Sequence, residues 1–212
     1  MKKLFIFDLD GTLADAYDAI YDSLNFTRNR LGYPVVPYQT VKESVGKGDR
    51  LFIDMFFAEK DRTKALTIYR RHHLVSLTKK AKPQPHARGV LGRLKRRGKA
   101  VSIASNRPTA YTLVILKRLN FLKYIDFILC ADKIKTIKPD PAILLKTLAY
   151  FKLCRRHAVF IGDMAIDMET ARRARMDAVF IKGGSSRPKE IKEKYPGVPV
   201  LSGLNDIFKV YE

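Results

Sequence analysis

The chain has 212 residues, 46% of them hydrophobic, which suffices for one α/β domain with a modest insertion and a buried core. No segment approaches the roughly 18 consecutive apolar residues of a membrane-spanning helix, and the first apolar run meets a charge too early for a signal peptide, so we expect a cytoplasmic protein without a membrane span. The net charge of +20 comes from scattered basic residues without a nucleic-acid motif, which favours a solvated basic surface over a nucleic-acid partner.

The first predicted element is a buried strand at Leu4–Phe7, and two carboxylates, Asp8 and Asp10, follow it directly. Residues two apart on a strand project to the same side, so both carboxylates can reach one reacting group. Gly11 then allows the backbone to turn sharply. This arrangement suits phosphate chemistry, in which one carboxylate attacks and the other handles a proton.

The next part of the chain shows helical patterns alone, with predicted helices at residues 16–31, 38–45, 50–57 and 62–79. Two prolines stiffen a return linker at residues 82–85. We therefore expect a helical cap at residues 15–82, inserted into a core domain formed by residues 1–14 and 83–212. His72 and His73 are adjacent on the last of these helices and point in different directions, so we interpret them as surface residues of the cap.

From residue 86 onward, predicted helices and strands alternate, as a doubly wound parallel sheet requires. The predicted helices are 87–97, 109–119, one that begins at Pro141, and 166–175; the predicted strands are 100–104, 127–130, 158–161 and 178–181. A short strand at Val200 and a terminal helix from Asn205 complete the core. We expect Cys130 and Cys154 to be reduced thiols in or near the core.

Further polar residues follow the predicted strands at their carboxyl ends, the edge at which open parallel sheets bind ligands. They are Ser105, Asn106 and Asp163, with Lys138 in the loop after the strand 127–130 and Asp167 four residues beyond Asp163. We expect Ser105 and backbone N–H groups to hold phosphate oxygens, with Asn106 as a substrate contact.

A carboxylate that approaches a phosphate dianion is repelled by roughly 4 kcal/mol per charge pair at about 4 Å and an effective dielectric of about 20, so cations are required. Lys138 supplies one. An all-oxygen ligand set favours Mg²⁺ as the second, with Asp8, Asp163, the Asp10 backbone oxygen and, through water, Asp167 as its ligands.

Four segments resemble, in order, the motifs of the haloacid dehalogenase superfamily, over essentially the whole chain. They are Asp8-Leu9-Asp10-Gly11-Thr12, Ser105, Lys138-Pro139-Asp140-Pro141, and Gly162-Asp163-Met164-Ala165-Ile166-Asp167. The resemblance implies a Rossmann-like core, Mg²⁺ as cofactor, a phosphorylated Asp8 as intermediate, and Asp10 as the acid and base. The carboxylate at Asp10 separates the chain from the dehalogenating branch.

The helical insertion is similar to the small cap of the phosphoglycolate phosphatase and β-phosphoglucomutase group. By this resemblance, residues 45–50 form the candidate specificity loop, and Lys47 and Arg50 are candidate contacts to an anionic substrate. The interpretation that we favour is a phosphatase for a small phosphorylated metabolite, with a phosphoglycolate-like compound as the best guess. A phosphomutase, or a basic nucleic-acid-associated protein on the same scaffold, remains the alternative.

Overall fold

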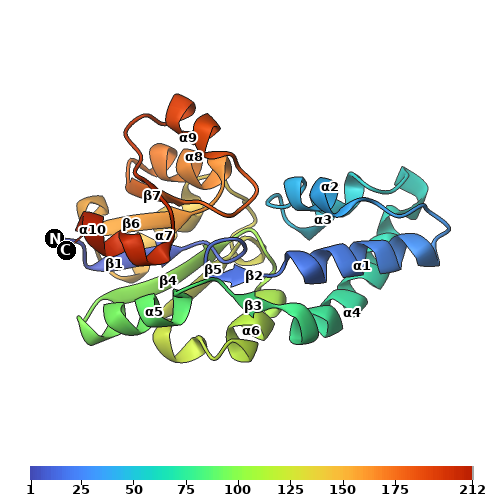
Figure 1. Cartoon of the computed structure of the whole chain (residues 1–212), viewed down its shortest axis with the longest axis horizontal. Helices are drawn as coiled ribbons and strands as arrows, with labels where there is room; N and C mark the ends of the chain where they lie inside the picture. The colour runs from blue at the N-terminus through green and yellow to red at the C-terminus, as the bar shows by residue number, and fades with distance from the viewer. Residues whose placement is uncertain (212) are drawn as a thin grey trace.

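The computed structural model describes residues 1–211 and contains a six-stranded parallel sheet in the order β5-β4-β1-β6-β7-β8 (Figure 1). The strands are β1 (Leu4–Phe7), β4 (Ala100–Ser105), β5 (Phe127–Cys130), β6 (Ala158–Gly162), β7 (Asp177–Ile181) and β8 (Val200–Leu201). The predicted α/β class and the predicted strands are confirmed. The sequence pattern does not provide the order of the strands, which places β1 near the middle of the sheet.

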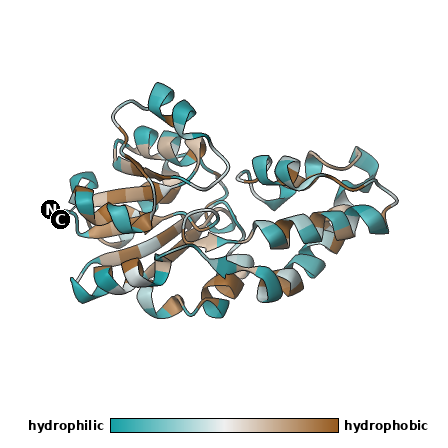
Figure 2. Ribbon diagram, in the orientation of Figure 1, coloured by the Kyte–Doolittle hydropathy of each residue, from teal (hydrophilic) through white to brown (hydrophobic). Residues whose placement is uncertain are grey.

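Helices cover both faces of this sheet, which explains why its strands are apolar on both sides. Along β1, Phe5 and Phe7 belong to one buried cluster, and Leu4 and Ile6 to another on the opposite face. The first face is covered by α5 (Ala87–Arg96), α6 (Thr109–Arg118) and α10 (Ile207–Tyr211); the second by α7 (Ala142–Tyr150), α8 (Ala165–Ala174) and α9 (Pro188–Lys194). Figure 2 shows the apolar strands between helices with hydrophilic outer surfaces.

Four helices form a separate lobe at one end of the molecule, here called the cap lobe (Figure 1). They are α1 (Tyr17–Arg30), α2 (Tyr38–Glu43), α3 (Asp49–Asp54) and α4 (Arg62–Lys80). Their contact faces share a cluster of buried side chains that includes Leu24, Phe52 and Tyr69. The cap lobe thus has a hydrophobic core of its own.

The two chain segments that enter and leave the cap lobe pair with each other as antiparallel strands, β2 (Ala14–Asp15) and β3 (Lys82–Pro83). The sequence indicates only a proline-stiffened linker at this point. We propose that these strands mark the division between residues 15–82 and the core at residues 1–14 and 83–212. Short 3-10 helices lie elsewhere, at Glu59–Asp61, Leu122–Tyr124, Ala131–Lys133, Arg155–His157 and Leu204–Asp206.

The two cysteines differ in their surroundings. Cys130 is buried at the end of β5 and its thiol donates to Thr112, as expected of a core thiol. Cys154 is exposed, so its predicted place in or near the core is wrong. It precedes a surface 3-10 turn rather than a strand. Among residues 1–211, no helix combines the length and apolar character needed to cross a bilayer.

Candidate active site

The predicted site residues meet at the carboxyl edge of the sheet, because β1 lies between β4 and β6 and runs parallel to both. Phe7, the last residue of β1, pairs with Ile103 and with Ile161. This register brings the residues that follow the three strands together. Asp8, Ser105 and Met164, each after one of these strands, line a cavity of about 60 Å³ under the cap lobe, whereas Asp163 and Asp167 lie outside its lining. The residues around it include Asp8, Asp10, Ser105, Asn106, Arg107 and Lys138 from the core, and Gly46, Asp49, Phe52, Tyr69 and His73 from the cap lobe.

Three buried carboxylates, those of Asp8, Asp163 and Asp167, place oxygens within 4.8 Å of one another. Lys138 joins two of them, since its Nζ lies 2.8 Å from Oδ1 of Asp8 and 2.6 Å from Oδ1 of Asp167. Burial would lower the pKa of Lys138, but Asp167 and Asp8 raise it above its usual value. The lysine therefore stays charged and offsets part of the repulsion between the carboxylates.

One lysine does not balance this cluster. Burial, together with the charges of Asp167 and Asp8, raises the pKa of Asp163 well above its usual range. Burial also raises the pKa of Asp167 to about 6, although Lys138 opposes the rise. A buried group of oxygen donors with this excess of negative charge is suited to a hard divalent cation.

The turn after β1 packs directly against Asp163. Gly11 has a φ of +79°, and a Cβ at this position would lie 2.2 Å from Oδ2 of Asp163. The next residue, Thr12, donates its hydroxyl hydrogen to Oδ1 of Asp163 at 2.7 Å. A glycine is therefore required both by the backbone conformation and by the close approach of the carboxylate.

Ser105 and Asn106 follow β4 and both line the cavity. The Ser105 hydroxyl oxygen accepts from the backbone N–H of Arg107 at 3.2 Å. The Asn106 side chain accepts from the Lys138 backbone N–H at 2.7 Å and donates to the Gly46 carbonyl of the cap lobe at 2.8 Å. Asn106, predicted as a substrate contact, thus connects the lysine loop with the cap lobe.

Arg107 is a prominent residue of the cavity that the sequence analysis missed. Its Nε lies 2.6 Å from Oδ2 of Asp10 and its Nη2 lies 2.8 Å from Oδ1, so the guanidinium forms a fork on the carboxylate. Burial raises the pKa of Asp10 above its usual value, and the charge of Arg107 opposes this rise. The sequence does offer one indication of Arg107: it is a basic residue that directly follows the polar pair Ser105 and Asn106 at the end of β4.

His73 is buried, so its predicted place on the cap surface is wrong; His72 is partly exposed and stacks on Phe26. The spacing of Tyr69, His73 and Leu77, four residues apart, puts all three on the buried side of α4. This helical spacing is visible in the sequence. Adjacent helical residues point in different directions, so a surface position for His72 does not imply one for His73.

The two predicted cap contacts, Lys47 and Arg50, are both exposed and neither lines the cavity. Asp49, between them in the chain, does line the cavity and pairs with Arg70 at 2.7 Å. The structure thus separates Lys47 and Arg50 from the other predicted site residues. In this conformation, Arg107 and Lys138 are the basic residues that line the cavity.

Comparison with known proteins gives consistent matches. A family model described as haloacid dehalogenase-like hydrolase matches residues 5–181. The chain is 31% identical over 172 residues to a phosphoglycolate phosphatase of Aquifex aeolicus, with 81% of each chain covered. It is 26% identical to a phosphoglycolate phosphatase of Nitrosococcus oceani, with 97% of this chain and 94% of that protein covered.

A solved structure has the same fold. The crystal structure described as a predicted phosphoglycolate phosphatase from Haemophilus somnus superimposes with a TM-score of 0.92 at 22% sequence identity. The match covers 100% of this chain and 98% of that one. The likeness therefore extends over the sheet and the cap lobe together.

Proposed function

Because the chain belongs to the haloacid dehalogenase-like hydrolases and is a phosphatase, we propose that it hydrolyses a small phosphomonoester through a phosphorylated Asp8. The observation that carries this proposal is the arrangement of Asp8 beside Lys138, with Asp10 in the same cavity. Phosphoglycolate is the first substrate to test, since similar proteins bear that name.

The carboxylate cluster fits Mg²⁺, which we propose as the cofactor. Its three side chains offer oxygen donors within 4.8 Å of one another, and the raised pKa values of Asp163 and Asp167 indicate an unmet need for positive charge. We propose that Asp8 and Asp163 hold the ion, with the Asp10 backbone oxygen, while Asp167 orients its water. When bound, Mg²⁺ supplies positive charge beside the phosphate.

In the first proposed step, a carboxylate oxygen of Asp8 attacks phosphorus, and the bond between phosphorus and the leaving oxygen breaks. Asp10 donates a proton to that oxygen, so the product leaves as an alcohol. The Lys138 ammonium reduces repulsion between the nucleophile and the phosphate. The Ser105 hydroxyl holds a phosphate oxygen.

In the second proposed step, water attacks the phosphorus of phosphorylated Asp8. Asp10, now ionised, takes a proton from that water, and the bond between phosphorus and Asp8 breaks. The products are inorganic phosphate and the regenerated Asp8 and Asp10. Both steps therefore need Asp10 to keep a fixed direction toward the reacting oxygen.

The shape of the cavity supports a small substrate. Its volume of about 60 Å³ is well below the roughly 300–1,000 Å³ of pockets for drug-sized ligands. Its cap side carries Ile20, Val45, Phe52 and Tyr69 together with the polar Asp49 and His73. Lys47 and Arg50 remain predicted substrate contacts that need a movement of the cap loop.

Replacement of Asp8 by Asn should lower the rate of phosphate release from phosphoglycolate and from an aryl phosphate by about 10³-fold or more, because the amide is a poor nucleophile. The far-ultraviolet circular dichroism should be unchanged. Turnover near that of the wild type in this variant would refute the mechanism. Isomerised sugar phosphate in place of free phosphate, in a screen of phosphorylated metabolites, would indicate a mutase.

A further inference from the structure

His73 lies on α4 of the cap lobe and faces the core. It is 1% exposed, stacks on Tyr69 at 4.9 Å between ring centroids, and meets the edge of Tyr111 of α6 at 5.0 Å. Contacts on both sides hold the imidazole ring in one plane. Its two nitrogens therefore have fixed directions, one toward the cap lobe and one toward the cavity.

The hydrogen bonds around His73 determine which nitrogen carries the proton. The Ser23 hydroxyl donates to the Ala19 carbonyl at 2.7 Å, so its oxygen is left to accept from Nδ1 of His73 at 3.1 Å. On the other side, Nη1 of Arg107 lies 2.8 Å from Nε2. Since arginine can only donate, Nε2 must be the acceptor and His73 is neutral with its proton on Nδ1.

This neutral form is also favoured electrostatically. Burial and the adjacent Arg107 hold the pKa of His73 well below its usual value. A protonated ring would direct an N–H against the N–H of Arg107. The bond from Arg107 to His73 is thus a feature of the neutral side chain that the buried environment maintains.

We propose that His73 is a positioning residue, through which the cap lobe sets the Arg107 guanidinium on both carboxylate oxygens of Asp10. The inference rests on the proposed function, in which Asp10 transfers protons in both steps. The chain of contacts runs from Ser23 and His73 in the cap lobe to Arg107 and Asp10 in the core.

The geometry explains why Arg107 needs this partner. A guanidinium is planar, so the direction of Nη1 fixes the directions of Nε and Nη2 as well. Without Nε2, a buried charged donor of Arg107 would lack an acceptor and the side chain would turn to find one. Asp10 would then lose the two contacts that aim its carboxylate.

The test compares three variants in an assay of phosphate release with Mg²⁺. His73→Phe keeps an aromatic ring between Tyr69 and Tyr111 but has no acceptor, and we expect kcat to fall about tenfold or more with KM changed less than about threefold. His73→Gln retains an acceptor oxygen and should recover kcat to within about threefold of the wild type. His157→Phe, in the surface turn Arg155–His157 before β6, makes the same replacement away from the cavity and should leave both constants within about twofold.

A second pair of variants serves if His73→Phe folds poorly. Ser23→Ala removes the acceptor for Nδ1 and should lower kcat about two- to fivefold, since only the ring contacts and the bond from Arg107 then hold the imidazole. Ser76→Ala is its matched control, because Ser76 is another buried serine between α4 and α1 that bonds instead to Asp22 at 2.7 Å. It should not change kcat.

The side-chain Nε–H resonance of Arg107 gives a readout that does not depend on turnover. In spectra of ¹⁵N-labelled protein it should be sharp in the wild type and in His73→Gln, and shifted or broadened in His73→Phe. An unchanged resonance with unchanged kcat in His73→Phe would overturn the proposal, as would equal losses in His73→Gln and His73→Phe. An inactive wild type, or an active Asp8→Asn variant, would instead overturn the proposed function and leave this spectroscopic test valid.

Discussion

At the scale of single residues, the ionisation of Asp163 and Asp167 links the stability of the fold to pH. The pKa of Asp167 is raised to about 6 from the usual aspartate value of 3.8, and that of Asp163 is raised well above the same value. Between about pH 4 and pH 6 the carboxyl group of Asp167 holds a proton in the folded protein that it has already released in the unfolded chain. The free energy of unfolding of the metal-free protein should therefore fall as the pH rises through about 4 to 6.

Mg²⁺ should change this dependence, because a cation favours the ionised carboxylates. We expect added Mg²⁺ to raise the melting temperature more at pH 7.5 than at pH 5, where it must displace protons. A concentration of about 100 times the dissociation constant would stabilise the folded state by about 2.7 kcal/mol. Thermal melting at the two pH values, with Mg²⁺ or a chelator, measures the effect.

Two variants check that this response belongs to the carboxylate cluster. Asp163→Asn should abolish the stabilisation by Mg²⁺ at pH 7.5. Asp177→Asn should retain it, because Asp177 is exposed at the start of β7 and pairs with Lys2. An equal response at both pH values would contradict the assignment of these carboxylates to the ion.

At the scale of elements, the loop between α2 and α3 makes one of the contacts between the cap lobe and the core. The Gly46 carbonyl accepts from Asn106 at 2.8 Å, and Gly46 has a φ of +123°. A Cβ at this position would lie 2.4 Å from Cε of Met164, which belongs to the loop that holds Asp163. The Met164 methyl group ends a flexible side chain and can shift, so the positive φ is what favours glycine at this position.

Gly46→Ala should weaken closure of the loop by about 1–3 kcal/mol through backbone strain, which corresponds to a loss of about 5- to 150-fold in kcat/KM. Gly32→Ala is the matched control, since Gly32 also has a positive φ, of +75°, and a Cβ added there would meet no atom within 4 Å. It should lower the melting temperature and leave kcat/KM unchanged. Equal activity in the two variants would show that the loop does not control access to the cavity.

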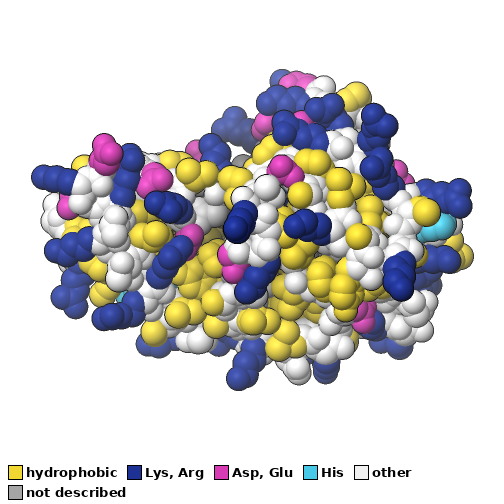
Figure 3. Space-filling model, turned by 180° about the vertical axis from the view of Figure 1, so that it is seen from behind, with side chains coloured by type: hydrophobic (Ala, Val, Ile, Leu, Met, Phe, Trp, Pro, Cys, Tyr) yellow, Lys and Arg dark blue, Asp and Glu magenta, His cyan; other side chains and the backbone are white. Residues whose placement is uncertain are grey.

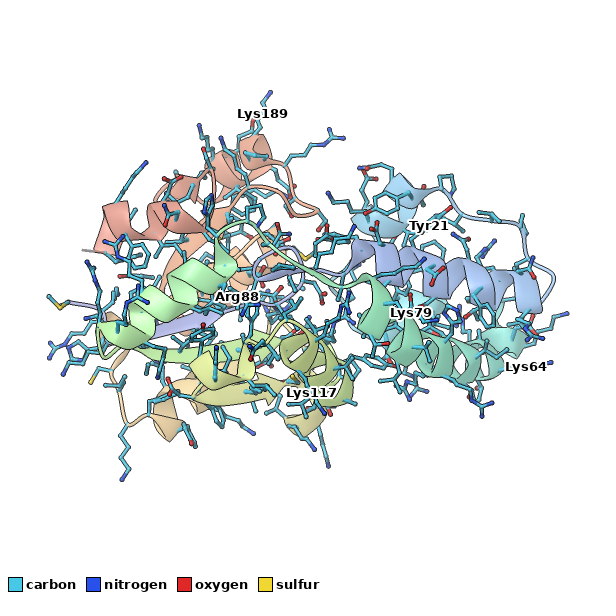
Figure 4. The ribbon with its side chains drawn as sticks, turned by 60° about the horizontal axis from the view of Figure 1, so that its bottom comes forward. Tyr21, Lys64, Lys79, Arg88, Lys117 and Lys189 are labelled. Atoms are coloured by element: carbon cyan, nitrogen blue, oxygen red, sulfur yellow. The ribbon has the colours of Figure 1, made fainter. Side chains whose placement is uncertain are left out.

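At the scale of the whole molecule, the net charge of +20 is spread over the surface. Figure 3 shows lysine and arginine side chains over the whole visible face, with few acidic ones between them. The labelled Lys64, Lys79, Lys117 and Lys189 in Figure 4 lie on α4, α6 and α9 and are exposed. Arg88 of α5 instead packs over the Phe121 ring and donates to the Leu119 carbonyl. On the face seen in Figure 3 the basic side chains do not gather into a single track for a nucleic-acid backbone.

Duplex DNA should therefore bind weakly and without sequence preference, with an affinity whose logarithm falls linearly with the logarithm of salt concentration. At physiological salt we expect a dissociation constant of about 10⁻⁴ M or weaker, measured by fluorescence anisotropy of a labelled duplex. Tight binding at that salt concentration would favour the alternative of a nucleic-acid-associated protein. A matched measurement with single-stranded DNA would show which form is bound.

The sequence by itself determined the strands of the main sheet and the positions of the candidate site residues. Strands buried on both faces must be apolar throughout, and strand ends must carry the ligand-binding groups, so the strands, Asp8, Asp10, Lys138 and Asp163 were recognisable from local pattern and order. These are properties of consecutive residues.

Only the tertiary structure decided which side chains face one another across the boundary between the cap lobe and the core. His73 and Arg107 are 34 residues apart in the chain, yet Nε2 of His73 lies 2.8 Å from Nη1 of Arg107. Lys47 and Arg50 are exposed, although the residues next to them in the chain line the cavity. The physical reason is that such contacts depend on how the cap lobe and the core are placed relative to each other. A polar side chain can be buried at their boundary when a partner from the other unit satisfies its hydrogen bonds.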